Sequence, residues 1–265
     1  MSDRVVVCEP WRMDPLAWIH RAEARAIARE LDAPLAAFRG ALPADHALLR
    51  LSDPVMRRVV RDPARPYCGP GSAALERCYD KYEAHRIVAE AGVDVPATAL
   101  ADSPALPNAP FVLKPRRGSD SIGVEIAHCV SPAKRHESYL AQERIVGDEL
   151  TVGVFREQTG MPLRIFLRPG RPYSFLRKYL MRPRRAPVPD ERIRGVASRV
   201  AQLLGVDWAA RVDLIVEAGT GRICFLECDA APLVGPDSAF AASFAAAGVD
   251  RAQQLRWLLS PRTLP

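Results

Sequence analysis

The sequence predicts an α/β (α+β) protein with a small N-terminal parallel-sheet unit and a C-terminal antiparallel sheet. Two patterns indicate this class. Residues 4–8 and 46–52 form apolar strand patterns on either side of a helical pattern over about 16–31, and strand–helix–strand order is typical of parallel sheets. Residues 211–229 instead contain two strand patterns joined by a short glycine-containing turn, which is typical of an antiparallel hairpin.

The segments between these two units continue the alternation of helices and strands. Residues 61–72 are rich in proline and glycine and mark a boundary, after which Ser72 is expected to cap a long helix to about Ala91. Further strands are expected at 111–114, 121–127 and on both sides of a glycine turn within 138–155, and further helices at about 190–204, 237–247 and 250–259. The proline- and glycine-rich segment therefore separates the N-terminal unit from the rest of the chain.

The composition is that of an ordinary globular protein. Among 265 residues, 48% are hydrophobic and 26% are charged. No apolar run approaches the roughly 20 residues that cross a bilayer, and no signal peptide opens the chain. The six cysteines lack metal-site spacing. We therefore expect a cytoplasmic protein with free thiols and no membrane partner.

The positive charge leaves nucleic acid open as a partner without favouring it. The net charge is +6, and basic residues are dense between Arg164 and Arg194. Such density suits nucleic-acid phosphates, a nucleotide or a small anionic substrate. The segment lacks a nucleic-acid-binding motif, and aromatic residues make up only 7% of the chain, which disfavours stacking on single strands. Nucleic acid is therefore an unlikely partner.

The C-terminal hairpin is expected to gather three carboxylates. Glu227 and Asp229 are two residues apart on one strand and therefore share a face. A three-residue loop at 219–221 sets Asp213 opposite Glu227, with Arg211 on the same face. Carboxylates so close repel one another unless a cation neutralises them, and Mg²⁺ prefers oxygen ligands. A solvated acidic strand face is the alternative.

Two further places carry candidate binding residues. Glu9 follows the first strand, at the edge where open α/β sheets bind ligands, and either holds a substrate amine or is a solvated loop carboxylate. Lys114 ends a strand and precedes a loop rich in glycine and serine, whose backbone amides suit phosphate oxygens. The loop residues are Gly118, Ser119, Ser121 and Gly123. It does not match the GxxxxGK[ST] phosphate loop, because no helix is expected after it.

Six motifs, taken in their order, make a specific pattern. They are DKY, LKPRRGSDSIGV, QERIVGDELTV, RKYL, RVDLIVE and FLECDAAPLVGPDS, and they span residues 80–238. This set resembles the ATP-grasp superfamily, and within it the D-alanine–D-alanine ligases and related amino-acid ligases. The resemblance implies three α/β subdomains, expected at residues 1–70, 71–141 and 142–265, with ATP held between the central and C-terminal ones. It also implies a ligase that forms an acylphosphate from a carboxylate, lets an amine attack it and releases ADP and phosphate.

The resemblance assigns the ATP-binding residues. Lys81 and Lys114 match lysines that contact ATP phosphates, and the loop from Gly118 to Gly123 matches the loop that covers them. Gln142 stands where the family has a glutamate beside adenine, and Glu149 matches the residue that holds the ribose. The full expected set is Lys81, Lys114, Gly118, Ser119, Ser121, Gly123, Gln142, Arg144, Ile145, Glu149 and Lys178.

The resemblance also assigns metal, catalytic and substrate residues. Asp213, Glu227 and Asp229 match the ligands of magnesium, with two ions expected and Mn²⁺ as a substitute. Arg211 matches the arginine that stabilises the oxyanion, and Lys178 and Tyr179 match the closing loop. The expected substrate-binding residues are Glu9, Leu233 and Ser238, of which Ser238 matches the serine that holds the acceptor carboxylate.

Two departures from the family bear on the substrates. The glycine- and serine-rich N-terminal signature of D-alanine–D-alanine ligases is replaced by CEPW, and Leu233 replaces a glycine whose backbone aids the oxyanion. We therefore expect small-molecule carboxylate and amine substrates other than two D-alanines. The alternatives are a D-alanine–D-alanine ligase proper, a glutamate–amine ligase that uses Arg182, Arg184 and Arg185, and a non-catalytic nucleotide-binding regulator. A homodimer stays open.

Overall fold

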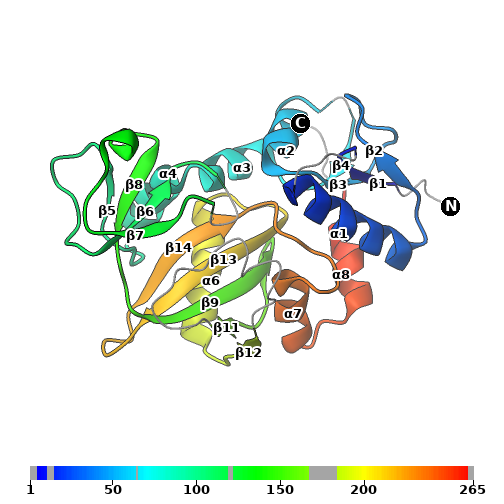
Figure 1. Cartoon of the computed structure of the whole chain (residues 1–265). Coiled ribbons are helices and arrows are strands. Elements are labelled where there is room, and N and C mark those ends of the chain that lie inside the picture. The colour runs from blue at the N-terminus through cyan, green and yellow to red at the C-terminus, as the bar shows by residue number, and fades with distance from the viewer. Residues whose placement is uncertain (1–4, 11–14, 64, 119–121, 167–183, 262–265) are drawn as a thin grey trace.

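The computed structural model describes residues 5–10, 15–63, 65–118, 122–166 and 184–261. Within these ranges the strands form three sheets, of four, six and four strands. Figure 1 shows the N-terminal and central sheets at opposite ends of the molecule, with the large C-terminal sheet between and below them. One parallel sheet and two antiparallel sheets confirm the predicted mixed α/β class.

The N-terminal sheet is parallel and has the strand order β2-β1-β3-β4. The apolar residues of its two central strands, among them Val6 and Leu49, are fully buried. Its elements are β1 (Val6–Cys8), α1 (Pro15–Leu31), β2 (Leu35–Ala37), β3 (Ala47–Arg50), α2 (Asp53–Arg61) and β4 (Tyr67–Cys68). The predicted strand–helix–strand order is confirmed. The short β2 and β4 were not predicted, because strands of three and two residues show no periodicity.

The single helix expected over 72–91 is wrong, because the chain breaks at Asp80 into α3 (Ser72–Tyr79) and α4 (Lys81–Glu90). Asp80 has an extended backbone, and its carboxylate caps α4 by accepting from the Glu83 amide at 3.2 Å. Arg116 and Arg117 donate to the same carboxylate at 2.8 and 2.9 Å. The break makes Lys81 the first residue of α4. The contacts of Asp80 with Arg116 and Arg117 also join the start of this helix to the segment that follows Lys114.

The central sheet is antiparallel and has the strand order β5-β8-β6-β7. Phe111, Leu113 and Ala141 form its buried core with residues of the surrounding loops. Its elements are β5 (Thr98–Leu100), β6 (Phe111–Pro115), β7 (Glu125–Ala127), a 3₁₀ turn (Pro132–Lys134) and β8 (Tyr139–Glu143). The last strand therefore ends two residues beyond the expected subdomain limit at residue 141.

The C-terminal sheet is antiparallel and has the order β12-β11-β9-β13-β14, with β10 beside β9. Val152 and Val154 share a core with Ile193 of α6, whereas Gly153 faces the carbonyl of Phe240 in α7. Because strand residues alternate between faces, α6 and α7 cover opposite faces of this sheet. The elements are β9 (Gly147–Phe155), β10 (Gln158–Thr159), β11 (Leu163–Ile165), β12 (Arg185–Pro187), α6 (Glu191–Leu203), β13 (Ala209–Glu217), β14 (Ile223–Asp229), α7 (Ala239–Ala246) and α8 (Arg251–Leu258).

The core runs from the N-terminal unit into the large sheet without interruption. One cluster joins Val7 and Leu49 of the parallel sheet to Val212 and Phe225 of the hairpin.

Among the described helices, none is both long and apolar enough to span a membrane.

Candidate active site between two cavities

The β13–β14 hairpin brings one arginine and three carboxylates to the sheet face that α7 covers. Arg211 pairs with Asp229 and Asp213 pairs with Glu227 in the strand register, as the sequence predicts. On the neighbouring strand Thr151 lies opposite Asp213, and its hydroxyl donates to that carboxylate at 2.6 Å. The sheet therefore presents a polar patch whose members come from three adjacent strands.

This register is reached by a different turn from the one expected. The Glu217 amide donates to Arg222 and the Gly221 amide to Glu217, which makes a four-residue loop at 218–221. A β-bulge after Asp213 then shifts the pairing by one residue and restores the register at the carboxylates. The carbonyl of Leu226, at the bulge, lies 2.8 Å from Nε2 of the buried His85, so His85 has a structural partner here.

Arg211 lies among the three carboxylates. Its Nε donates to Asp213 at 3.0 Å, and its terminal nitrogens lie 3.9 Å from Glu227 and 3.8 Å from Asp229. Burial alone would lower the pKa of Arg211, but Asp213, Asp229 and Glu227 raise it well above its usual value. The guanidinium is therefore a permanent positive charge held against the sheet.

The donor set suits a hard cation, although the oxygens are not arranged as a closed cage. In the described part of the chain, no group of three or more Asp, Glu, His or Cys side chains is placed to hold a metal ion. Asp213 is engaged by Arg211 and Thr151, whereas Glu227 and Asp229 lie nearly 4 Å from the guanidinium. Mg²⁺ commonly takes one or two carboxylates and completes its shell with substrate phosphates and water. Glu227 and Asp229 fit that mode.

The two lysines assigned to phosphate lie beside the hairpin. Lys114, at the end of β6, is buried and donates to Gln142 Oε1 at 2.8 Å. Burial lowers the pKa of Lys114 to about 8, while Glu227 acts in the opposite direction. Lys81 donates to the carbonyl of Gly118, where the glycine- and serine-rich loop begins. The structure thus brings four of the predicted nucleotide-binding residues together.

Glycine is required at both ends of the loop from 118 to 123. Gly118 and Gly123 have φ of +136° and +76°, a region that L side chains rarely adopt. A Cβ on Gly123 would also approach Pro115 Cγ to 3.0 Å. Ser119 and Ser121, between them, lie outside the described residues.

Strands β8 and β9 and the connection between them carry four of the predicted nucleotide-binding residues, namely Gln142, Arg144, Ile145 and Glu149. Gln142 donates to Thr98 Oγ1 at 2.9 Å, and Arg144 and Ile145 are half-buried just beyond it. Glu149 lies on β9 two residues before Thr151, so it shares the face of the polar patch. Burial, with the nearby charges of Asp213 and Glu227, raises the pKa of Glu149 to about 7.

Of the expected substrate residues, two are engaged in holding local structure. Glu9 is buried and accepts from the Ser52 amide at 2.8 Å, which joins the end of β1 to the start of α2. Ser238 caps α7 by accepting from the Ala241 amide at 3.0 Å. Lys178, Tyr179 and Arg182 lie outside the described residues.

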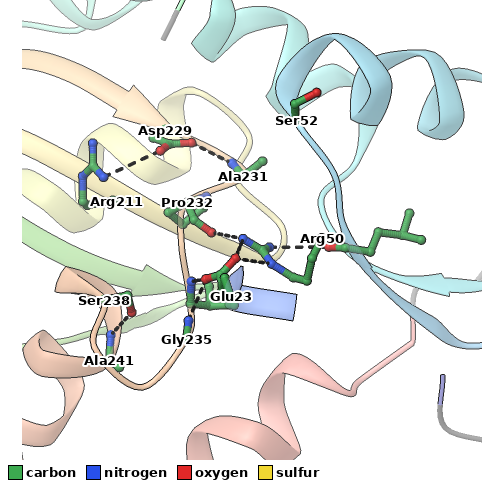
Figure 2. A network of polar contacts seen from close by, with 12 residues as sticks. Glu23, Arg50, Ser52, Arg211, Asp229, Ala231, Pro232, Gly235, Ser238 and Ala241 are labelled. Carbon is green, nitrogen blue, oxygen red and sulfur yellow. Dashed lines mark hydrogen bonds and ion pairs between the residues drawn. The ribbon is translucent and has the colours of Figure 1, made fainter. Parts of the chain in front are cut away.

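A buried ion pair that was not predicted from the sequence reaches the loop between β14 and α7. Arg50 Nε donates to Glu23 Oε2 at 2.8 Å, and an Arg50 terminal nitrogen donates to the Pro232 carbonyl at 2.6 Å. Glu23 Oε1 accepts from the amides of Val234 and Gly235. Figure 2 shows both side chains pointing at this loop, with Ser238 nearby. A charge inside the apolar strand pattern HALLRLS was the available signal, since buried arginines are paired.

Two cavities meet at Arg211. One lies between α3, α4 and the hairpin, and its lining includes Lys81, Gly118, Glu227 and Asp229. The other, of about 320 Å³, is enclosed by α1, the sheet and the loop before α7, and its lining includes Asp213, Leu233 and Ser238. Because Arg211 lines both, one fixed positive charge separates the expected phosphate side from the expected substrate side.

Comparison with known proteins identifies the family of this chain. The family model described as the ATP-grasp domain matches residues 78–230, more than half of the chain. This chain belongs to the ATP-grasp family. The match covers Lys81, the glycine loop and all three carboxylates, and it confirms the family resemblance that the sequence motifs indicate.

Two curated relatives of this ATP-grasp chain are both D-alanine–D-alanine ligases. It is 29% identical over 209 residues to the D-alanine–D-alanine ligase of Albidiferax ferrireducens, covering 69% of this chain and 60% of that protein. It is 31% identical over 189 residues to the corresponding ligase of Syntrophotalea carbinolica, covering 63% of this chain and 60% of that protein. The chain thus spans about 60% of the length of these two curated relatives.

Solved structures confirm the fold of this ATP-grasp chain. A D-alanine–D-alanine ligase from Bacillus anthracis, complexed with ATP, has a TM-score of 0.78 at 18% identity, covering 98% of this chain and 96% of that chain. A D-Ala:D-Ser ligase from Enterococcus faecalis also has a TM-score of 0.78, at 17% identity, covering 97% of this chain and 98% of that chain. At this identity the likeness establishes the fold.

Proposed function

We propose that this protein is an ATP- and Mg²⁺-dependent carboxylate–amine ligase that forms an amide or peptide bond through an acylphosphate. The observation that carries the proposal is the position of Arg211 between two cavities. One cavity is lined by Lys81, Gly118, Glu227 and Asp229, which suit nucleotide phosphates with magnesium. The other has room for a small organic substrate.

The nucleotide side rests on residues of four elements. Lys81 and Lys114 neutralise phosphate charge, and the backbone of the loop from Gly118 to Gly123 covers the phosphates. Gln142, Arg144 and Ile145 border the base, and Glu149 faces the ribose. Phosphoryl transfer is catalysed mainly by such positioning and charge neutralisation.

The metal side rests on the carboxylates. Glu227 and Asp229 hold Mg²⁺, and Asp213 contributes an oxygen if its ion pair with Arg211 opens. Bound Mg²⁺ supplies charge neutralisation at the phosphates. Two ions and replacement by Mn²⁺ are part of this proposal.

Arg211 is the catalytic residue at the reacting carbonyl. A fixed cation that faces a developing oxyanion lowers the barrier by about 3–4 kcal/mol. The three carboxylates keep this guanidinium in place before any substrate arrives. Ser238, at the start of α7, faces the second cavity and is proposed to hold the acceptor carboxylate.

The substrates are proposed to differ from two D-alanines. Leu233 lines the second cavity at the position where the family has glycine. Its side chain occupies space through which a substrate would otherwise reach the backbone at this position. The alternative, a D-alanine–D-alanine ligase proper, is favoured by the names of the relatives.

A screen for ADP release tests the proposal directly. Purified protein with ATP and Mg²⁺ would be offered pairs of amino acids and amines, with mass detection of any condensed product. ADP release coupled to a new amide supports the ligase. Tight ATP binding without turnover on any pair would favour the non-catalytic nucleotide-binding regulator instead.

A further inference from the structure

The second cavity has a strongly asymmetric lining. Most of the lining residues from α1 and from the loop before α7 are apolar, whereas the polar groups come mainly from the sheet. The apolar lining residues are Trp18, Ile19, Ala22, Ala26, Leu233 and Pro236. A site for a small polar molecule such as alanine would need little of this surface, because a methyl group buries little area.

Trp18 adds a second observation. Its side chain is 60% exposed although it lines the cavity. A large aromatic side chain left in water at the mouth of a cavity gains free energy when an apolar group covers it. Ile19 and Ala22 lie next to it on the cavity side of α1, so the apolar surface is continuous.

The loop before α7 is held against α1 by the buried ion pair. Glu23 binds the amides of Val234 and Gly235, and Arg50 binds the Pro232 carbonyl (Figure 2). A Cβ on Gly235 would approach Glu23 Cγ to 2.9 Å, so the loop lies directly on this side chain. Leu233 is therefore presented to the cavity by a loop that is anchored on both sides of it.

The charges of the lining disfavour an acidic side chain. Among the described residues, the cavity is bordered by three carboxylates, of Glu23, Asp213 and Asp237, and by two guanidinium groups, of Arg185 and Arg211. An additional carboxylate on the substrate side chain would therefore meet no excess of positive charge among the described lining residues. This argues against the glutamate–amine ligase.

From these observations we propose that the second cavity is the subsite for an amino-acid substrate with a bulky apolar side chain, of the size of leucine or phenylalanine. The side chain lies against Trp18, Ile19 and Leu233, and the amino-acid head group lies toward Arg211 and Ser238. This inference rests on the proposed ligase function, since it names the substrate class of that site.

Binding measurements test this without requiring turnover. The full-length protein, loaded with Mg²⁺ and a non-hydrolysable ATP analogue, would be titrated calorimetrically with leucine, phenylalanine, alanine and glutamate, each as both enantiomers. We expect leucine or phenylalanine to bind at least about tenfold more tightly than alanine or glutamate, since each methylene in an apolar pocket contributes about tenfold or more. Equal or tighter binding of alanine or glutamate would overturn the proposal.

Matched variants locate the effect. Trp18→Ala is expected to weaken binding of leucine or phenylalanine about tenfold or more while leaving affinity for the ATP analogue unchanged. Because Trp18 is exposed, the variant is expected to fold as the wild type does. Leu106→Ala, in the central subdomain, is the control and is expected to change neither affinity. Unchanged leucine and phenylalanine binding in Trp18→Ala would contradict the subsite.

The two proposals fail in different ways. Leucine or phenylalanine binding without ADP release on any amine would sink the ligase and keep the apolar subsite. ADP release with alanine or glutamate as the preferred substrate would support the ligase and contradict the apolar subsite.

Discussion

Arg50 and Glu23 form an ion pair in the interior, with Nε and Oε2 2.8 Å apart and Arg50 wholly buried. Because the same glutamate binds two amides of the loop before α7, the pair joins the N-terminal unit to the wall of the second cavity. A buried charge that loses its partner remains desolvated, which makes such a pair costly to break.

We therefore expect Glu23→Gln to lower the free energy of unfolding by about 3 kcal/mol. Urea unfolding would measure the loss. Glu30→Gln is the control on the same helix, because the Glu30–Arg251 pair is a quarter exposed and is expected to contribute less than about 1 kcal/mol. Equal losses in the two variants would contradict the role given to burial.

Arg211→Lys is expected to lower kcat by about 10²–10³-fold with little change in the KM for ATP. The lysine keeps a positive charge but loses the planar fork that reaches all three carboxylates. Steady-state kinetics of ADP release would separate the two constants. A rise in KM for ATP at unchanged kcat would instead place Arg211 on the nucleotide.

Lys114 predicts a pH dependence of ATP affinity. Burial lowers its pKa to about 8 from its usual 10.5, and phosphate binding requires the charged form. Affinity should fall as pH rises through 8, by about tenfold per pH unit at most.

The unfolded chain binds more protons at Lys114 than the folded chain does between about pH 8 and 10.5, so this group makes the apoprotein more stable as pH rises through that range. Calorimetry of ATP binding from pH 7 to 9.5 checks the first point, and a flat profile would refute it.

Glu149 predicts the opposite trend in stability. Burial raises its pKa to about 7, so the folded state holds a proton that the unfolded state has released between about 4.5 and 7. Stability from this group is present at low pH and is lost as pH rises through that window. Glu149→Gln should raise the Tm of the nucleotide-free protein at pH 8 but not at pH 4.5, and it should weaken ATP binding. An identical pH profile of Tm in both proteins would count against this.

The sequence predicted most of the fold because its signals were local. The strand–helix–strand order of the first unit and the helix that Asp190 caps follow from periodicity and capping residues. The break at Asp80 did not follow, because it depends on Arg116 and Arg117, more than 30 positions away in sequence. Long-range partners of this kind leave no local pattern.

The site was predictable where it lies on one hairpin. Asp213 meets Glu227 as expected, although the longer turn and the bulge shift the register in opposite directions. Glu23 and Arg50 could not be connected to the loop before α7, because about 180 to 210 residues separate them from it. The candidate site residues of the central and C-terminal subdomains were predicted from sequence motifs. The packing of α1 against the loop before α7 could be seen only in the structure.

The most direct test of the account compares ADP release by the wild-type protein with that of Glu227→Gln and Asp229→Asn. Glu217→Gln, near the turn of the same hairpin, is the control. We expect the two site variants to lose ADP release by at least about 10²-fold, with thermal stability close to that of the wild type, and the control to retain it. Unchanged turnover in both site variants would contradict the assignment of the hairpin carboxylates to magnesium and thereby the ligase mechanism.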